Sequence, residues 1–401
     1  MKVINLSVLA VSVAMSLAAM ATPVLADDAP PATPAAPAGP SLGAVIAATP
    51  GLTITGYVAA TYDYFGTDTP MLRQFDTTQN GFTANQAALT VAYLPASGAG
   101  VQVTAIGGSD AQILRSGEVY PTGTSSTQFD LFNAFAQYAM DTYTLIGGKF
   151  STLAGAEVAT PNGDNEISRS LLFTEMEPIT HTGVRVVDAV SPALTLTGGV
   201  NNGWNYTSSP SANNGSSGKT LELGASGAPN KMFAYSFAYY NGDSPLFDGV
   251  GVGATSNLQL FDAVLTWNAT DSLTFILNDD YLSKDNVGLL TGKTGTGTAN
   301  GIALYANYAM NSEWMLSLRG EYVDDSNGML ALNTGVAMGG FAGATSETQK
   351  EGTVAINYTP VKNLKLSGEL REDKSSIGLF TKSGSAASTQ GSMEFQAMYM
   401  F

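Results

Sequence analysis

Apolar and polar side chains alternate with a period of two along most of the chain after residue 51. The pattern is clearest in residues 363–371 (NLKLSGELR) and 393–401 (MEFQAMYMF). Successive side chains of a β-strand point to opposite faces, so this period predicts strands with one apolar and one polar face. We expect strands over residues 52–65, 85–95, 100–108, 128–140, 142–151, 180–190, 193–202, 219–227, 231–241, 258–269, 272–283, 299–310, 313–324, 349–359, 363–373 and 392–401.

The connections between these strands alternate between short turns and long polar stretches. The short turns lie at 95–100, 141, 191–192, 229–230, 270–271, 311–312 and 359–363. The long stretches lie at 66–84, 109–127, 152–179, 203–218, 242–257, 284–298, 325–348 and 374–391. This layout is typical of outer-membrane barrels. The sequence therefore predicts an all-β fold, a closed antiparallel transmembrane β-barrel of about 16 strands (roughly 14–18), with short periplasmic turns and long extracellular loops.

Closure of this sheet follows from the properties of lipid. An open edge in lipid would leave backbone N–H and C=O groups without partners, so the first strand should pair with the last. The polar faces then line a lumen that is wide enough for water at this strand number. The charged residues that we expect to face the lumen are Glu222, Arg319, Glu321, Lys365, Glu369 and Arg371.

The N-terminus has the layout of a secretory signal peptide, with Lys2, an apolar run and small residues up to Ala26. An uncleaved anchor helix is the alternative, although the apolar run is short for a membrane span. Residues 27–50 begin DDAPPATPAAPAGP and predict a mobile periplasmic tether. The expected organisation is a signal peptide over 1–26, a tether over 27–50 and the barrel over 51–401.

Composition excludes several classes of function. There are 17 Lys and Arg against 33 Asp and Glu, so the net charge of −16 disfavours binding to nucleic acid. The chain has no cysteine and one histidine, which excludes disulfides, thiolate sites and multi-histidine metal sites. The glycine-rich run at 292–298 lacks the ending of a phosphate loop. Acidic residues at the long-loop ends of the strands could bind Ca²⁺ or Mg²⁺ that bridges lipid phosphates, but we favour a solvated acidic rim. These residues are Asp243, Asp248, Asp279, Asp280, Asp285, Asp324 and Asp325. We therefore expect no cofactor, no metal site and no catalytic residues.

The long stretch 152–179 carries most of the candidate site residues. Porin barrels are often narrowed by a loop that folds into the lumen, where opposed basic and acidic groups select ions. The alternative is an extracellular loop that only packs on its neighbours, with Arg169 as a structural anchor for loop carbonyls. The candidates for a pore constriction are Glu157, Asp164, Glu166, Arg169, Glu175, Glu177, His181 and Arg185.

His181 and Arg185 lie four residues apart on one face of an expected strand. They could form a polar pair at the pore mouth, but a structural histidine is the reading that we favour. A serine hydrolase would need a nucleophile beside His181. Ser168 and Ser170 are near it in sequence, but the chain has no G-x-S-x-G motif around them.

Several features of residues 145–186 recur in one family of membrane proteins. They are GGKF at 147–150, PN at 161–162, SRS at 168–170 and HTG at 181–183. Together with GYVAATYDYF at 56–65 and WNY at 204–206, these features resemble the OmpL-like β-barrel porins of Gram-negative bacteria. The resemblance implies a porin in the cell outer membrane, but it implies no particular solute.

Phe401 ends the chain two residues after Tyr399, and this ending resembles the terminal strand that the barrel insertion machinery recognises. The expected partners are this machinery, outer-membrane lipids and lipopolysaccharide, with a homotrimer as the assembly to test. The expected function is passive diffusion of small hydrophilic solutes or ions through an aqueous lumen. The alternatives are a structural or adhesive barrel with a plugged lumen and, less favoured, an outer-membrane enzyme.

Overall fold

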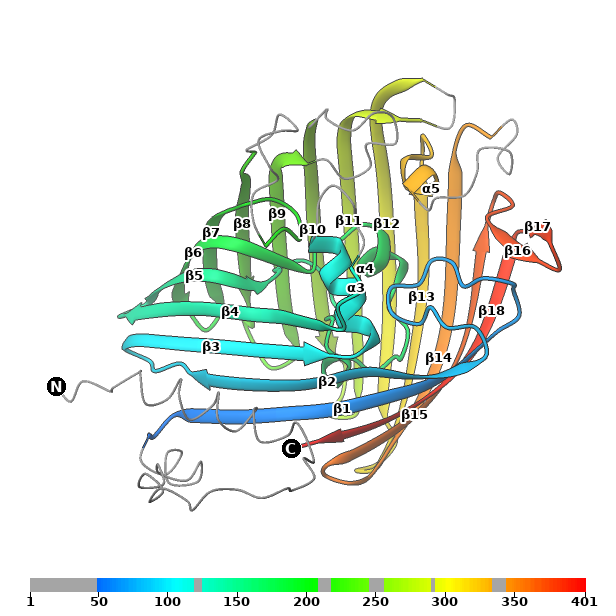
Figure 1. Cartoon of the computed structure of the whole chain (residues 1–401). Helices are drawn as coiled ribbons and strands as arrows, with labels where there is room; N and C mark the ends of the chain where they lie inside the picture. The colour runs from blue at the N-terminus through cyan, green and yellow to red at the C-terminus, as the bar shows by residue number, and fades with distance from the viewer. Residues whose placement is uncertain (1–48, 119–124, 208–217, 245–255, 290–292, 334–343) are drawn as a thin grey trace, which may run out of the picture. The chain divides into compact units, whose positions relative to one another are not determined.

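The computed structural model describes residues 49–118, 125–207, 218–244, 256–289, 293–333 and 344–401. The expected signal peptide, and all but the last two residues of the expected tether, lie outside these ranges. Sixteen strands form a closed antiparallel barrel in the order β1-β18-β15-β14-β13-β12-β11-β10-β9-β8-β7-β6-β5-β4-β3-β2 (Figure 1). The predicted fold class and strand number are confirmed.

The barrel strands are β1 (Leu52–Phe65), β2 (Gly81–Tyr93), β3 (Gly98–Gly107), β4 (Phe129–Met140), β5 (Tyr143–Ser151), β6 (Thr180–Ser191), β7 (Leu194–Asn201), β8 (Thr220–Gly227), β9 (Phe233–Ser244), β10 (Ser256–Asn268), β11 (Leu273–Gly288), β12 (Thr294–Ala309), β13 (Trp314–Asp325), β14 (Glu347–Val361), β15 (Leu364–Ser375) and β18 (Thr389–Met400).

The first and last strands close the barrel. The Gly56 N–H donates to the Phe401 carbonyl at 3.0 Å, and the Phe401 N–H donates to the Gly56 carbonyl at 2.9 Å. The register then runs from Tyr57 opposite Met400 to Phe65 opposite Ser392. The predicted pairing of the first strand with the last is therefore confirmed.

Side chains along the strands alternate between the lumen and the outer surface. On β18, Glu394 is fully buried whereas the neighbouring Phe395 is 51% exposed. The charged residues predicted to face the lumen all lie on inner faces, where Lys365 is half-buried and the others are buried. The outer faces carry the large exposed apolar side chains, as contact with lipid requires.

Some of the predicted loops contain regular structure. These elements are helix α3 (Ser109–Glu118), helix α5 (Met329–Asn333) and the hairpin of β16 (Phe380–Lys382) and β17 (Ser385–Ala387). The prediction of a loop over 284–298 is wrong, because β11 continues to Gly288 and β12 begins at Thr294. These two extensions are largely polar on both faces, so the period that reveals a half-apolar strand is missing from them.

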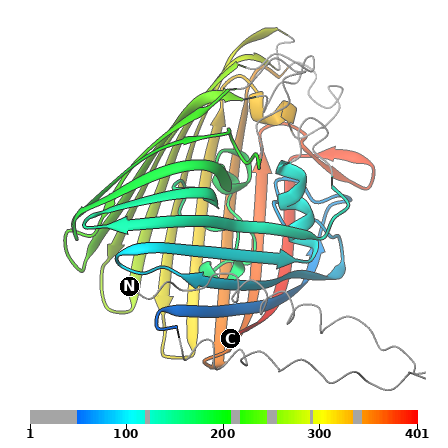
Figure 2. The same ribbon diagram turned by 60° about the vertical axis from the view of Figure 1, so that its left-hand side comes forward.

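The hydrophobic clusters of the protein lie inside the ring of strands. Helices α3 and α4 (Leu171–Glu175) sit within the barrel (Figures 1 and 2). Leu171 and Leu172 of α4 are fully buried in a cluster that also contains Leu260 of β10 and Leu282 of β11. Across the described ranges, the helices are all too short or too polar to cross a membrane. The lumen is therefore partly filled by the chain itself.

Gly56→Ala should destabilise the barrel at the seam between β1 and β18. An added Cβ would lie 2.5 Å from the Ala88 carbonyl oxygen and would also overlap the ring of Phe401. Overpacking of this kind costs about 1–3 kcal/mol. We expect a lower midpoint of heat unfolding, followed by loss of the folded, heat-modifiable band on gels. Gly320→Ala is the control, since an added Cβ there meets nothing within 4 Å; equal losses in both variants would contradict the seam geometry.

Candidate pore constriction

Residues 152–179, hereafter the inner segment, leave the end of β5, fold inside the barrel and return to the start of β6 (Figure 1). The Thr152 N–H donates to the Ile179 carbonyl at 3.0 Å, which joins the two ends of the inner segment. Between them lie a 3-10 turn, η1 (Pro161–Gly163), and helix α4. The inner segment therefore differs from the alternative in the sequence analysis, an extracellular loop that only packs on its neighbours.

The start of α4 is held by its own cap and by the barrel wall. The Ser170 hydroxyl accepts a hydrogen bond from the Phe173 N–H at 3.0 Å. The Glu321 carboxylate of β13 accepts the Leu171 N–H at 2.9 and 2.8 Å. The first N–H groups of a helix have no partner within the helix, so a wall carboxylate at this place stabilises it. A residue predicted to face the lumen thus fastens the inner segment.

Two residues of β15 hold the preceding part of the inner segment. The Glu369 carboxylate accepts the Ile167 N–H at 2.6 Å and the Ser168 N–H at 3.2 Å. The Lys365 ammonium donates to the Asp164 carbonyl at 2.6 Å. Both wall residues bond mainly to backbone groups, so they fix the path of the chain.

Arg319 of β13 connects the inner segment with the acidic side chains of the wall. Its guanidinium donates to the Glu157 carboxylate at 2.7 Å and to the Ser168 carbonyl at 3.0 Å. The same group pairs with Glu351 of β14 at 3.3 Å and with Glu321 at 3.5 Å. All four charged side chains are almost completely buried. Removing one partner of such a pair leaves the others as uncompensated buried charges.

Arg371 of β15 makes a second link of the same kind. Its guanidinium donates to the Arg169 carbonyl at 2.5 Å and to the Ser168 hydroxyl at 3.2 Å. Asp373, on the same inner face, accepts from it at 2.7 Å. The wall formed by β13, β14 and β15 therefore binds the inner segment through two buried arginines.

Arg169 itself is turned into the inner segment. It donates to the Val158 carbonyl at 2.7 Å and the Ile167 carbonyl at 2.9 Å, and it pairs with Asp164 at 3.1 Å. It is 2% exposed. These contacts are those of a structural anchor, which is the alternative that the sequence left open for this residue.

The acids of the inner segment carry less charge than the sequence suggests. Burial raises the pKa of Asp164 to about 7 and the pKa of Glu166 to about 8. Burial also raises the pKa values of Glu175 and Glu177 well above their usual range. Because burial favours the neutral carboxyl group, Glu166, Glu175 and Glu177 contribute little negative charge to the lumen at neutral pH. Asp164 titrates near neutral pH and pairs with Arg169.

His181 and Arg185 have separate sets of contacts. Arg185 donates to both oxygens of Glu222, at 2.5 and 2.8 Å. His181 is fully buried, stacks on Tyr240 at 4.7 Å and has its Nδ1 3.2 Å from the Gly203 carbonyl. Within the described ranges, no hydrogen bond links His181 to a serine hydroxyl. The arrangement is that of a packed structural histidine.

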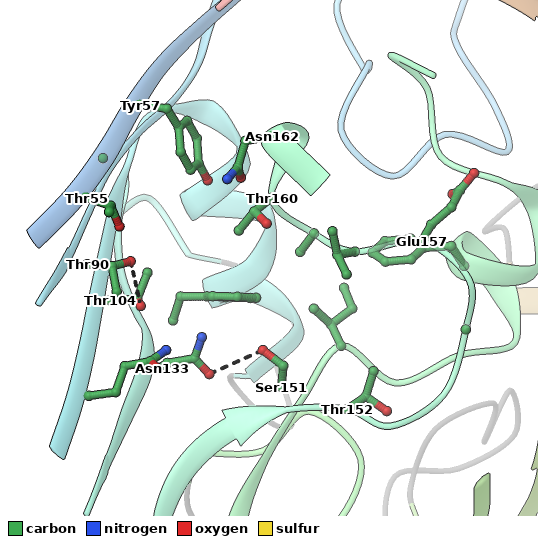
Figure 3. Close-up of a pocket in the computed structure, with 18 of the residues that line it drawn as sticks. Thr55, Tyr57, Thr90, Thr104, Asn133, Ser151, Thr152, Glu157, Thr160 and Asn162 are labelled. Carbon is green, nitrogen blue, oxygen red and sulfur yellow. Dashed lines mark hydrogen bonds between the residues drawn. The ribbon is translucent and has the colours of Figure 1, made fainter. Parts of the chain in front are cut away.

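A cavity of about 550 Å³ remains between residues 151–162 and the inner faces of β1 to β4 (Figure 3). Its wall is almost uncharged and combines polar with apolar side chains. The polar groups on the barrel side are those of Thr55, Tyr57, Thr90, Gln102, Thr104 and Asn133. Among the described residues that line it, only Glu157 is charged, and its carboxylate is bound by Arg319.

Sequence reasoning missed several residues of this site. Glu351 and Asp373 balance the two wall arginines, and they occupy inner-face positions of β14 and β15 that the period of two could have revealed. Arg73 comes from the predicted loop 66–84 and pairs with Asp373 at 2.7 Å. No local pattern shows that this loop turns inward, because the contact joins residues 300 positions apart in the chain.

The barrel, the folded-in segment and the polar cavity define the class of outer-membrane β-barrel porins. The chain belongs to the family described as "Putative beta-barrel porin-2, OmpL-like", whose model matches residues 51–401. The predicted resemblance and the predicted outer-membrane location are confirmed. No match was found among curated proteins.

Solved structures with a similar fold are outer-membrane proteins. OmpT of Vibrio cholerae, folded in vitro, is 12% identical with a TM-score of 0.59, covering 87% of this chain and 97% of that one. The channel DcaP of Acinetobacter baumannii is 14% identical with a TM-score of 0.56, covering 87% and 97%. The anion-selective porin from Comamonas acidovorans is 10% identical with a TM-score of 0.56, covering 87% and 99%. At these identities the likeness shows the fold.

Arg319→Ala should loosen the inner segment and leave the barrel closed. The substitution leaves Glu157 and Glu351 buried without their cation, and losing one partner of a buried pair costs about 3–5 kcal/mol. We expect faster hydrogen exchange in peptides from the inner segment and unchanged exchange in the strands. Lys374→Ala, at an exposed position of β15, is the control. Unchanged exchange in the Arg319 variant would contradict its anchoring role.

Proposed function

We propose that the chain is a porin whose solutes diffuse between the inner segment and the inner faces of β1 to β4. The cavity of about 550 Å³ on that side of the inner segment carries the proposal. The contacts of Arg319, Arg371 and Glu369 hold the inner segment against β13 to β15, so it narrows the lumen from one side. The constriction is thus formed by residues 151–162 and not by the acidic residues as a group.

The lining supports small hydrophilic solutes without strong selection by charge. Threonine, asparagine and glutamine side chains offer hydrogen bonds but no net charge to a solute. In the inner segment, Glu157 pairs with Arg319 of the wall and Asp164 pairs with Arg169, while burial raises the pKa values of Glu166, Glu175 and Glu177. The overall excess of acidic residues therefore does not set the selectivity, because selection depends on the groups at the narrowest point.

The direct test is single-channel recording with purified, refolded protein in a planar bilayer under a salt gradient. We expect discrete conductance steps and a reversal potential close to zero. If protein that shows heat-modifiable migration gives no channel currents, the proposal is contradicted, and the structural barrel with a plugged lumen is favoured. A large reversal potential would contradict the uncharged constriction.

Thr104→Trp should lower the single-channel conductance several-fold, because the indole group would occupy part of the cavity beside residues 151–162. Val103→Trp is the matched control, since the neighbouring side chain is 39% exposed on the outer face of β3. The comparison is made on single-channel currents of folded protein. Equal conductance in the two variants would contradict the assigned passage.

We further propose that the outer face of β6, β7 and β8 contacts other copies of the chain in a homotrimer. These three consecutive strands contain no Phe, Tyr or Trp. Elsewhere only β3 and β15 lack them among the described barrel strands, and each lies between strands that contain aromatic residues. Aromatic residues mark the positions where a barrel meets the membrane interface, so their absence supports contact with protein. The exposed residues of this face are Val184, Val186, Val190, Leu196, Val200, Leu221 and Leu223. Vibrio cholerae OmpT has a trimer form.

Val186→Arg should convert this assembly into monomers, because three buried guanidinium groups would lack partners at the contact. Val354→Arg on β14 is the control, since β14 lies on the opposite side of the barrel and Val354 is similarly exposed. Light scattering in detergent measures the mass. A monomeric wild-type protein, or dissociation by both variants, would contradict the proposed contact.

A further inference from the structure

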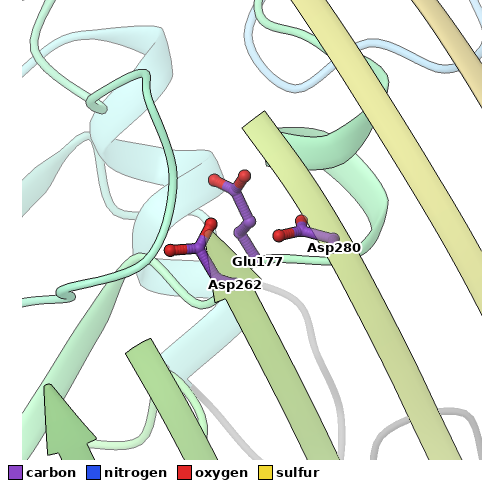
Figure 4. Close-up of side chains that lie close together, drawn as sticks. All are labelled: Glu177, Asp262 and Asp280. Atoms are coloured by element: carbon purple, nitrogen blue, oxygen red, sulfur yellow. The ribbon is translucent and has the colours of Figure 1, made fainter. Parts of the chain in front are cut away.

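Three carboxylates from distant parts of the chain meet inside the barrel, at a place that the constriction does not use. Asp262 of β10 and Asp280 of β11 lie directly opposite each other in the register of the two strands. Glu177, near the end of the inner segment, lies over them, and one oxygen from each of the three lies within 4.8 Å of the others. Figure 4 shows the three carboxylates turned toward the same space.

The two aspartates are an unfavourable pair in the protein alone. Like charges directly opposite each other on neighbouring strands are destabilising. Asp262 is 3% exposed and Asp280 is 1% exposed, so water does not screen them. None of the ion pairs between described residues includes Glu177, Asp262 or Asp280. The cluster therefore lacks the positive charge that an arginine supplies to Glu157, Glu222 and Glu351.

Two oxygens of the cluster also lack a hydrogen-bond donor. Asp262 Oδ1 and Asp280 Oδ2 are both excluded from solvent and have no partner among the described residues. The other oxygen of each aspartate has a donor, since Gly155 N–H and Asn278 Nδ2 reach Asp262 Oδ2 at 3.1 and 3.0 Å. Asn278 Nδ2 also lies 3.3 Å from Asp280 Oδ1. Buried polar atoms are satisfied in nearly all proteins, so the two remaining oxygens indicate a missing partner.

The inner segment is shaped to bring its two ends to this cluster. Gly155 has a φ of +91°, a conformation that favours glycine, and a Cβ there would overlap the Glu177 carboxylate. The next residue, Ala156, donates its N–H to Asn278 Oδ1 at 2.6 Å. The start of the inner segment thus contacts β10 and β11 through its backbone, while its end supplies Glu177.

We propose that Glu177, Asp262 and Asp280 bind a divalent cation of the size of Ca²⁺, which clamps both ends of the inner segment to β10 and β11. Ca²⁺ binds oxygen ligands at roughly 2.3–2.6 Å, so two of its ligands can lie up to roughly 4.6–5.2 Å apart. The oxygen separations in the cluster fit this range. Mg²⁺ binds at roughly 2.0–2.1 Å, requires a near-ideal octahedron and retains several waters, so a buried site of three carboxylates suits it less well.

Calcium titration of the refolded, full-length protein tests the proposal. The protein is treated with chelator in detergent free of lipopolysaccharide, and calcium chloride is added in a calorimeter. We expect saturable binding of one Ca²⁺ per chain, a rise in the unfolding temperature with added calcium, and weaker binding of magnesium. Asp280→Asn and Glu177→Gln should each weaken calcium binding by roughly tenfold or more. Glu177 lies outside the strands, so its variant keeps the barrel intact.

Asp279→Asn is the matched control, because it removes the same charge one residue away, from the exposed face of β11. Calcium binding should be unchanged in this variant. An equal loss in Asp279→Asn, or no calcium binding by the folded wild-type protein, would overturn the proposal and would mean that the three carboxyl groups share protons instead.

The effect of the cation on transport rests on the proposed pore function, whereas calcium binding does not. Chelation should increase the fluctuations of the open-channel current in wild-type protein and leave the Asp280→Asn channel unchanged. Calcium binding without any conductance would support the cation site and contradict the porin function. If the protein conducts ions but binds no calcium, and its conductance does not change on chelation, the cation site is contradicted and the porin function is not.

Discussion

Every backbone polar group in the membrane must find a partner within the protein, because lipid offers no hydrogen-bonding groups. This constraint requires a closed sheet, which the chain achieves by pairing Gly56 with Phe401 at the seam. Closure gives each strand one face toward lipid and one toward the lumen, so most of the charged residues of the strands lie on the inner face. The arginines and acids are buried because the closed barrel surrounds its inner face; they do not belong to a separate binding domain.

Confined charges need partners, and the inner segment provides many of them. Arg319 and Arg371 are balanced by neighbours on the wall and use their remaining donors on backbone carbonyls of the inner segment. Glu321 and Glu369 accept N–H groups from the same stretch. The interactions that satisfy the wall therefore also position the segment that narrows the lumen. Their concentration on β13 to β15 leaves space along β1 to β4 for the cavity, whose described lining residues are uncharged apart from Glu157.

The fold was accessible from the sequence because lipid imposes a regular pattern on it. The period of two identified the strands, the connections gave their order, and the same period placed residues such as Glu222 and Arg371 on the inner face. The pattern does not identify strands where lipid does not select apolar side chains, as in the polar extensions of β11 and β12. The three-carboxylate cluster was also inaccessible, because Glu177 meets Asp262 and Asp280 only through the path of the inner segment. Arg169 appeared as a charged candidate, but its role depends on carbonyls whose directions no sequence pattern specifies.

Thiol accessibility can report which side of the lumen is open, because the chain contains no cysteine. A single cysteine is introduced at Thr90, which lines the cavity, or at Ser317, which is fully buried on the inner face of β13. A charged, membrane-impermeant thiol reagent is then added during single-channel recording. We expect the reagent to reduce the current through Thr90→Cys and to leave the current through Ser317→Cys unchanged. Block at Ser317→Cys with no effect at Thr90→Cys would contradict a passage along β1 to β4 and would place it on the other side of the inner segment.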